Sequence, residues 1–176
     1  MITLSSESLL DFMQKNQYQA EIQAETQQIF SLLKFEQREF PLFIRIFDEG
    51  HLLQILIFVP SLLETSENYD PAKIPLNGKL NKPEVIADLA RLLHLFNKEL
   101  DVPGFGLDEM AGIVFYRIML PTPKKQIDSE LLLAYIKTAE HVCQMFSPSI
   151  QAVSSGKMTL DQILEKAQQV SNKESE

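Results

Sequence analysis

Two neighbouring apolar segments constrain the fold more than any other feature of this 176-residue chain. Residues 40–47 (FPLFIRIF) and 52–59 (LLQILIFV) are rich in the β-branched and aromatic residues that favour strands. The residues between them, Asp48-Glu49-Gly50-His51, are typical of a turn, and Gly50 can adopt a positive φ at no steric cost. The pattern predicts an antiparallel hairpin that ends at Pro60, because proline cannot continue a central strand.

Alternation and helical spacing predict the remaining elements around this hairpin. The expected strands cover residues 29–35, 40–47, 52–59, 105–107 and 112–120. The expected helices begin at Ser5 or Ser6, at Asn81, at Asp128 and at Thr159. The sequence therefore predicts an α+β protein, an antiparallel sheet of about five strands with helices packed on one face. The order is helix, three strands, helix, two strands, helix and a C-terminal helix.

Length and composition fit one domain. With 45% apolar residues the chain can bury a core of ordinary size without disulfides. We expect residues 1–156 to form the domain and residues 157–176 to add a C-terminal helix and a disordered tail.

The charge balance argues against nucleic acids and membranes as partners. The chain has 24 acidic and 16 basic residues, a formal net charge of −8. Phosphate neutralisation needs clustered Lys and Arg, whereas the basic residues here are scattered, with Lys124-Lys125 as the only adjacent pair. No segment approaches the roughly 18 apolar residues of a membrane span, and no signal peptide is visible. We therefore expect a cytoplasmic protein.

No metal or cofactor is expected from the residues present. His51, His94 and His141 have no carboxylate at i±4 that would complete a ligand pair. Cys143, the single cysteine, lies on the apolar face of its helix, which predicts a buried small hydrophobe and not a nucleophile.

One catalytic alternative remains open. Asp108 and Glu109, together with the long polar connection at residues 64–82, could form a loop-borne carboxylate site of an enzyme. Their position in an expected turn equally predicts a structural role.

The expected strands are apolar on both faces, and this feature points to function. In a half-exposed antiparallel strand one face should be polar. Here one face must pack on the helices, and the other carries aromatic residues, Met and Arg, which are enriched in binding interfaces. The candidate protein-binding residues on this second face are Phe43, Arg45, Phe47, Phe115, Arg117 and Met119. Either a terminal helix of the same chain covers this face, or a partner or a second copy does.

The order and the local sequences resemble the YbjN-type domain, which shares the type III secretion chaperone-like fold. The resemblance is carried by FPLFIRIFDEGHLLQILIFVP (residues 40–60), GFGLDEMAGIVFYRIMLP (104–121) and ELLLAYIKTAEHVCQMFSPSIQAVSSG (130–156). It implies a small, acidic, often dimeric protein that binds other polypeptides, and it supplies no catalytic residues. The resulting hypothesis is a non-catalytic, chaperone-like binding module. An enzyme and a purely structural dimer are the alternatives.

Overall fold

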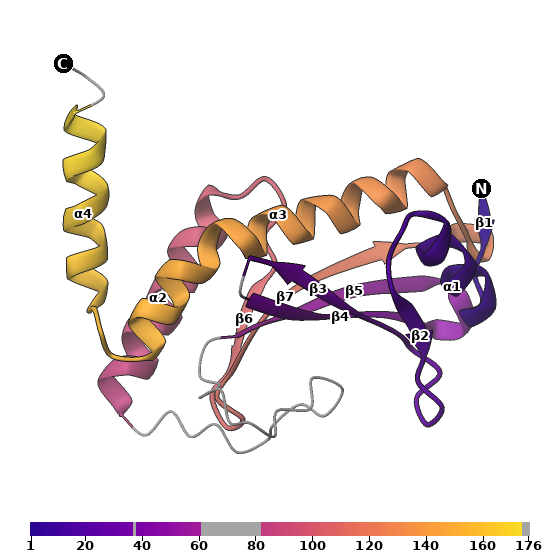
Figure 1. Cartoon of the computed structure of the whole chain (residues 1–176), viewed down its shortest axis with the longest axis horizontal. Coiled ribbons are helices and arrows are strands. Elements are labelled where there is room, and N and C mark those ends of the chain that lie inside the picture. Colours follow the sequence, from indigo (N-terminus) through magenta and orange to yellow (C-terminus); the bar gives the residue numbers. More distant parts are fainter. Residues whose placement is uncertain (37, 61–81, 174–176) are drawn as a thin grey trace.

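The computed structural model describes residues 1–36, 38–60 and 82–173 (Figure 1). Its strands are β1 (Ile2–Thr3), β2 (Ala20–Ile22), β3 (Ile29–Phe35), β4 (Arg38–Phe47), β5 (Leu52–Val59), β6 (Phe105–Asp108), β7 (Ile113–Pro121) and β8 (Gln126–Ile127). Its helices are α1 (Ser6–Lys15), α2 (Pro83–Glu99), α3 (Ser129–Ser154) and α4 (Leu160–Lys173). The predicted α+β class and the order of the helices and main strands are confirmed.

The main sheet has six antiparallel strands in the order β2-β3-β4-β5-β7-β6. The expected five strands are all present, and the short β2 adds an edge strand next to β3. A separate two-stranded sheet joins β1, which precedes α1, to β8, which directly precedes α3. In the β4–β5 connection Gly50 has a φ of 99°, as its place in the predicted hairpin requires.

The helices α1, α2 and α3 pack on one face of the sheet, where they form the main core. Figure 1 shows α3 running along the sheet, while α4 projects beyond it. The fully buried Tyr116 of β7 donates its hydroxyl hydrogen bond to the carbonyl oxygen of Val102. The predicted burial of Cys143 on α3 is confirmed.

Helix ends follow the sequence signals in most cases. The Asp128 carboxylate accepts hydrogen bonds from the backbone N–H groups of Glu130 and Leu131, which caps α3 as predicted. By contrast, α2 has Lys82 as its N-cap, without a side-chain hydrogen bond, and the expected cap Asn81 lies outside the described residues. At the start of α4, Leu160 is buried and its N–H donates to the Asp88 carboxylate of α2 over 3.0 Å.

Candidate protein-binding face

The sheet has a second, smaller apolar cluster on the side away from the helices, which we name the outer face. Its buried centre is Phe30, Phe43 and Leu56, one residue from each of three adjacent strands. Leu32, Phe58 and Phe115 pack around this centre. None of the described helices contributes a residue to this cluster. The two-sided apolar pattern of the strands therefore corresponds to two separate cores.

The strand register builds the outer face in rows across the sheet. One row runs from Phe30 through Phe43 and Leu56 to Arg117. The neighbouring row contains Arg45, Gln54 and Met119 on β4, β5 and β7. Arg45 and Gln54 thus stand beside an apolar row that has Glu21 of β2 at one end and Arg117 at the other.

All six candidate residues lie on strands β4 and β7 with their side chains on this face, but they are not equally accessible. Phe47 and Met119 are 40% and 41% exposed, and Arg117 is also exposed. Arg45 and Phe115 are half-buried. Phe43 is only 1% exposed, so it packs beneath the exposed residues of this face and cannot serve as the contact residue that we expected.

The two arginines are held by neutral groups. Arg45 donates from Nε to the Gln28 side-chain oxygen, and its guanidinium lies 5.9 Å from the Phe43 ring centre. Arg117 lies 5.6 Å from the centre of the Phe115 ring. Burial lowers the pKa of Arg45 from its usual value. Neither guanidinium forms an ion pair with a described residue.

Sequence reasoning missed several members of the face. Phe30 and Leu32 were not assigned to it because the parity of β3 depends on its register with β4. Gln54 was also not assigned to it; this residue is 7% exposed, and its buried Oε1 has no hydrogen-bond partner among the described residues. Its Nε2 approaches the Met119 sulfur at 3.4 Å.

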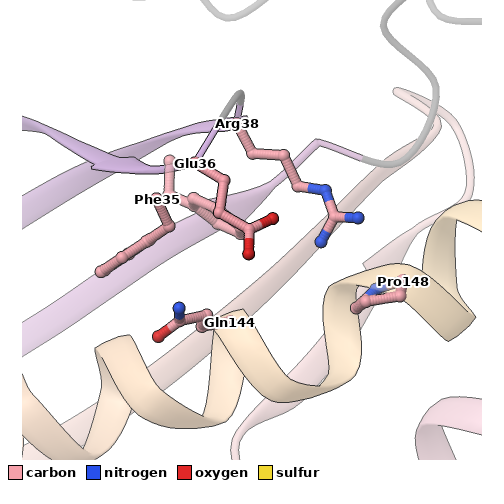
Figure 2. Close-up of a pocket in the computed structure, with 6 residues that line it drawn as sticks. Phe35, Glu36, Arg38, Gln144 and Pro148 are labelled. Atoms are coloured by element: carbon pink, nitrogen blue, oxygen red, sulfur yellow. The ribbon is translucent and has the colours of Figure 1, made fainter.

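A pocket of about 270 Å³ lies elsewhere, between the β3–β4 hairpin and α3. In Figure 2, Glu36 and Arg38 reach from the hairpin toward Gln144 and Pro148 of α3. Pro148 has no N–H to offer the Gln144 carbonyl, and the Ser147 hydroxyl donates to that oxygen at 3.4 Å. Arg38 in turn donates to the Ser147 oxygen at 3.1 Å. These contacts join the hairpin to the helix, which is a structural role for the pocket wall.

Titratable groups also gather where the connection between α1 and β2 meets α3, without forming a reactive site. Lys137 contacts the nearly buried Glu140 carboxylate at 2.8 Å and lies 4.8 Å from the Tyr18 ring centre. Burial and the nearby charge of Glu140 raise the pKa of Cys143. A nucleophilic cysteine needs the opposite shift, so this thiol is a core residue.

Two buried tyrosines should make the protein sensitive to alkali. Burial raises the pKa of Tyr18 and of Tyr116 to about 12, whereas an unfolded tyrosine titrates near 10. Between these values the unfolded chain loses protons that the native chain keeps, so the free energy of unfolding falls as pH rises. We expect a fall on the order of 2 kcal/mol per tyrosine, measured by urea denaturation from about pH 9 to about pH 12.

Phenylalanine variants distinguish the contributions of the two tyrosines to stability. Tyr18→Phe should leave stability at neutral pH almost unchanged, because the Tyr18 hydroxyl has no hydrogen-bond partner among the described residues. Tyr116→Phe loses its bond to Val102 and should cost roughly 1 kcal/mol at pH 7. Each variant should reduce the alkaline fall in the free energy of unfolding. If neither variant does, tyrosine burial is not the cause of that fall.

The remaining candidate groups have surface or turn roles. Asp108 accepts from the backbone N–H of Ala111 at 2.9 Å, which stabilises the β6–β7 turn, and both Asp108 and Glu109 are exposed. The described residues contain no group of three or more His, Cys, Asp or Glu side chains placed to hold a metal ion. Most of the 64–82 connection lies outside the described residues. Among the helices that are described, none is long and apolar enough to cross a membrane.

Residues 76–152 match the model of the YbjN family. The family is described as "Putative bacterial sensory transduction regulator". The match confirms the resemblance to the YbjN-type domain over these residues. No curated protein matches the chain. A chain from a solved HopA1–SchA chaperone–effector complex is 14% identical, with 82% of this chain and 91% of that chain covered and a TM-score of 0.42.

The YbjN match runs through α2, β6, β7 and most of α3. It therefore includes the β7 side of the outer face, with Phe115, Arg117 and Met119. The β4 side, with Arg45 and Phe47, lies before the matched residues.

Proposed function

We propose that this chain is a non-catalytic, chaperone-like binding module that holds a polypeptide, either a partner or a second copy, on its outer face. The observation that supports this most is the composition of that face. A sheet face exposed to water alone would be mainly polar, whereas this one exposes Phe47 and Met119 around a centre of buried aromatic rings.

The arginines fit an interface better than a closed core. An unpaired buried charge is very costly, but a guanidinium at the rim of an interface keeps contact with water while its stem packs on apolar groups. Arg45 and Arg117 have this arrangement, since each lies against a phenylalanine ring and neither is fully buried.

The family context supports a binding role and adds no catalytic residue. The YbjN family is described as a putative regulator of bacterial sensory transduction, and a regulator of that kind would act by contacting other macromolecules. The alternative of an enzyme with a carboxylate site loses its main support, because Asp108 is engaged in the β6–β7 turn.

Phe115→Asp should abolish association through the outer face while the monomer remains folded. Phe115 is half-buried at the rim, so a carboxylate there places charge in the apolar contact area but leaves the main core intact. Light scattering would report self-association, co-purification from the native host with mass spectrometry would report partners, and circular dichroism with a thermal melt would report the fold.

Leu131→Asp is the matched control, because Leu131 is 50% exposed on α3, away from the outer face. It should change neither association nor the fold. If Phe115→Asp unfolds the protein, Phe115 belongs to an internal core and the proposal is wrong. Association that survives in a folded Phe115→Asp variant would also exclude the outer face.

A further inference from the structure

One row of the outer face carries opposite charges at its two ends. The register runs from Glu21 on β2 through Phe30, Phe43 and Leu56 to Arg117 on β7. Glu21 lies on the outer side of the sheet, because the two residues next to it in β2 pack on the main core. Both end residues are exposed, and neither forms an ion pair within the described part of the chain. The row therefore offers a carboxylate at one end and a guanidinium at the other.

The neighbouring row holds a hydrogen-bond donor and an acceptor that the single chain leaves unmatched. Arg45 uses its Nε to bind Gln28, and its two Nη groups have no hydrogen-bond partner among the described residues. Gln54, which pairs with Arg45 across β4 and β5, is 7% exposed, and its buried Oε1 receives no hydrogen bond from any residue that the structure describes. A buried acceptor without a donor costs free energy, so an occupant that donates to it gains affinity.

A two-fold axis through the centre of the main sheet would match these groups. The six strands lie in the order β2-β3-β4-β5-β7-β6, so the centre falls between β4 and β5. An axis parallel to the strands at this position packs two sheets face to face, about 10 Å apart, as in an aligned β-sandwich. It lays β4 of each copy over β5 of the other, and β3 over β7. Each row then meets the same row of the second copy in the reverse order.

The unmatched donor and acceptor meet across this axis. Arg45 lies opposite Gln54 of the second copy, so a free Nη group can donate to the buried Oε1 once the exposed Met119 side chain moves aside. The symmetry forms this contact twice. An axis over β4 would instead place Arg45 against its own copy, and two like charges would then repel each other. The charges therefore favour the central position.

The charged ends of the first row meet across the same axis. Arg117 lies opposite Phe30 of the second copy, since β7 lies over β3. Glu21 of that copy is one strand spacing further along the row, about 5 Å, which a long arginine side chain can span while its stem packs on the phenylalanine ring. By symmetry two such pairs form, one at each side of the interface.

The apolar residues of the face fit this arrangement too. Phe43 lies opposite Leu56 of the second copy, and two rows further on Phe47 lies opposite Leu52. Phe47 is 40% exposed in the single chain, and this contact removes its ring from water. Burial of the apolar side chains provides the attraction, and the polar pairs determine how the two copies align.

We infer that the outer face binds a second copy of this chain, as a two-fold dimer in which Arg45 contacts Gln54 and Arg117 contacts Glu21 across the interface. This inference rests on the proposed function and names the occupant of its site. The opposite signs of Glu21 and Arg117 decide the choice, because a face with charges of one sign would repel its own copy, whereas this face is complementary to itself.

Sedimentation velocity over a range of concentrations tests the inference on the full-length chain. Wild type should form a dimer. Arg117→Glu and Glu21→Arg should each raise its dissociation constant roughly tenfold or more, because like charges then face each other. The double variant should recover most of the affinity, since the exchange restores opposite charges. Arg91→Glu, an equal charge change on the exposed side of α2, should alter the constant by less than about twofold.

The other outcomes distinguish this inference from the proposed function. A monomer at every concentration overturns the inference, and the proposed function stands if a partner that co-purifies with wild type is lost from Phe115→Asp. A dimer that Phe115→Asp dissociates, but that the double charge exchange does not restore, also overturns the inference, because the faces then pair in another arrangement. A dimer that neither Arg117→Glu nor Phe115→Asp weakens uses a different surface and overturns it as well. If, in addition, no co-purifying partner depends on Phe115, the proposed function falls with it.

Discussion

Phe43→Ala should lower the free energy of unfolding by about 3–4 kcal/mol, as much as a large-to-small change in a main core, although Phe43 lies on the outer face. The side chain is 1% exposed, and its ring centre lies 5.2 Å from Phe30 and 5.5 Å from Phe58. Removing the ring leaves a cavity bounded by strands that cannot collapse without breaking the sheet. Urea denaturation followed by circular dichroism would measure the loss.

Phe47→Ala is the matched control on the same strand and face. Phe47 is 40% exposed, so its removal should cost less than about 1 kcal/mol. Similar costs for the two variants would show that the outer cluster is not a second core. A Phe43 variant is therefore unsuitable as a test of binding, because its loss of stability could be mistaken for a loss of binding.

Gly104→Ala should destabilise the protein by about 3 kcal/mol, because there is no room for a methyl group at this position. A Cβ on Gly104 would lie 2.6 Å from the backbone oxygen of Arg117 and 2.9 Å from the Tyr116 ring. Neither neighbour can move easily: the Arg117 N–H bonds to the Gly104 carbonyl, and Asn97 accepts from the Gly104 N–H. Thermal and urea denaturation would show a lower midpoint.

Gly106→Ala provides the comparison two residues further on. A Cβ there would collide with the Phe115 ring, but this ring is half-exposed and can rotate toward solvent. The expected cost is about 1 kcal/mol, and it should largely disappear in a Phe115→Ala background, where the obstruction is gone. Equal costs for Gly104→Ala and Gly106→Ala would contradict the distinction between a fixed backbone and a movable ring.

Local sequence patterns predicted the hairpins and the caps well, because these depend on neighbours along the chain. The β4–β5 hairpin, the Asp128 cap and the two faces of β4 and β7 all follow from residues within a few positions of each other. The alternation of side chains along β4 places Phe43 in the outer cluster and its neighbour Ile44 in the main core.

What the sequence could not provide depends on residues far apart in the chain. The burial of Phe43 results from Phe30 and Leu56 on both sides, which only the strand register brings together. The β1–β8 pairing joins the two-residue segment Ile2–Thr3 to Gln126–Ile127 and is too short to leave a pattern. Pro148 lies inside α3, which nevertheless continues to Ser154, and the Ser147 hydroxyl donates to the Gln144 carbonyl that Pro148 leaves without an N–H.

The place of β5 in the sheet has a consequence for how the protein folds. The strands β3, β4 and β5 form a meander of consecutive pairs, whereas β5 pairs on its other side with β7, after α2 and β6 have intervened in the chain. Closing that long loop costs entropy before the Val59–Val114 pairing compensates it. We expect the rate-limiting step to be the docking of the C-terminal hairpin onto a meander already formed. Core substitutions in β3 and β4 would then slow folding, whereas those in β7 would mainly speed unfolding.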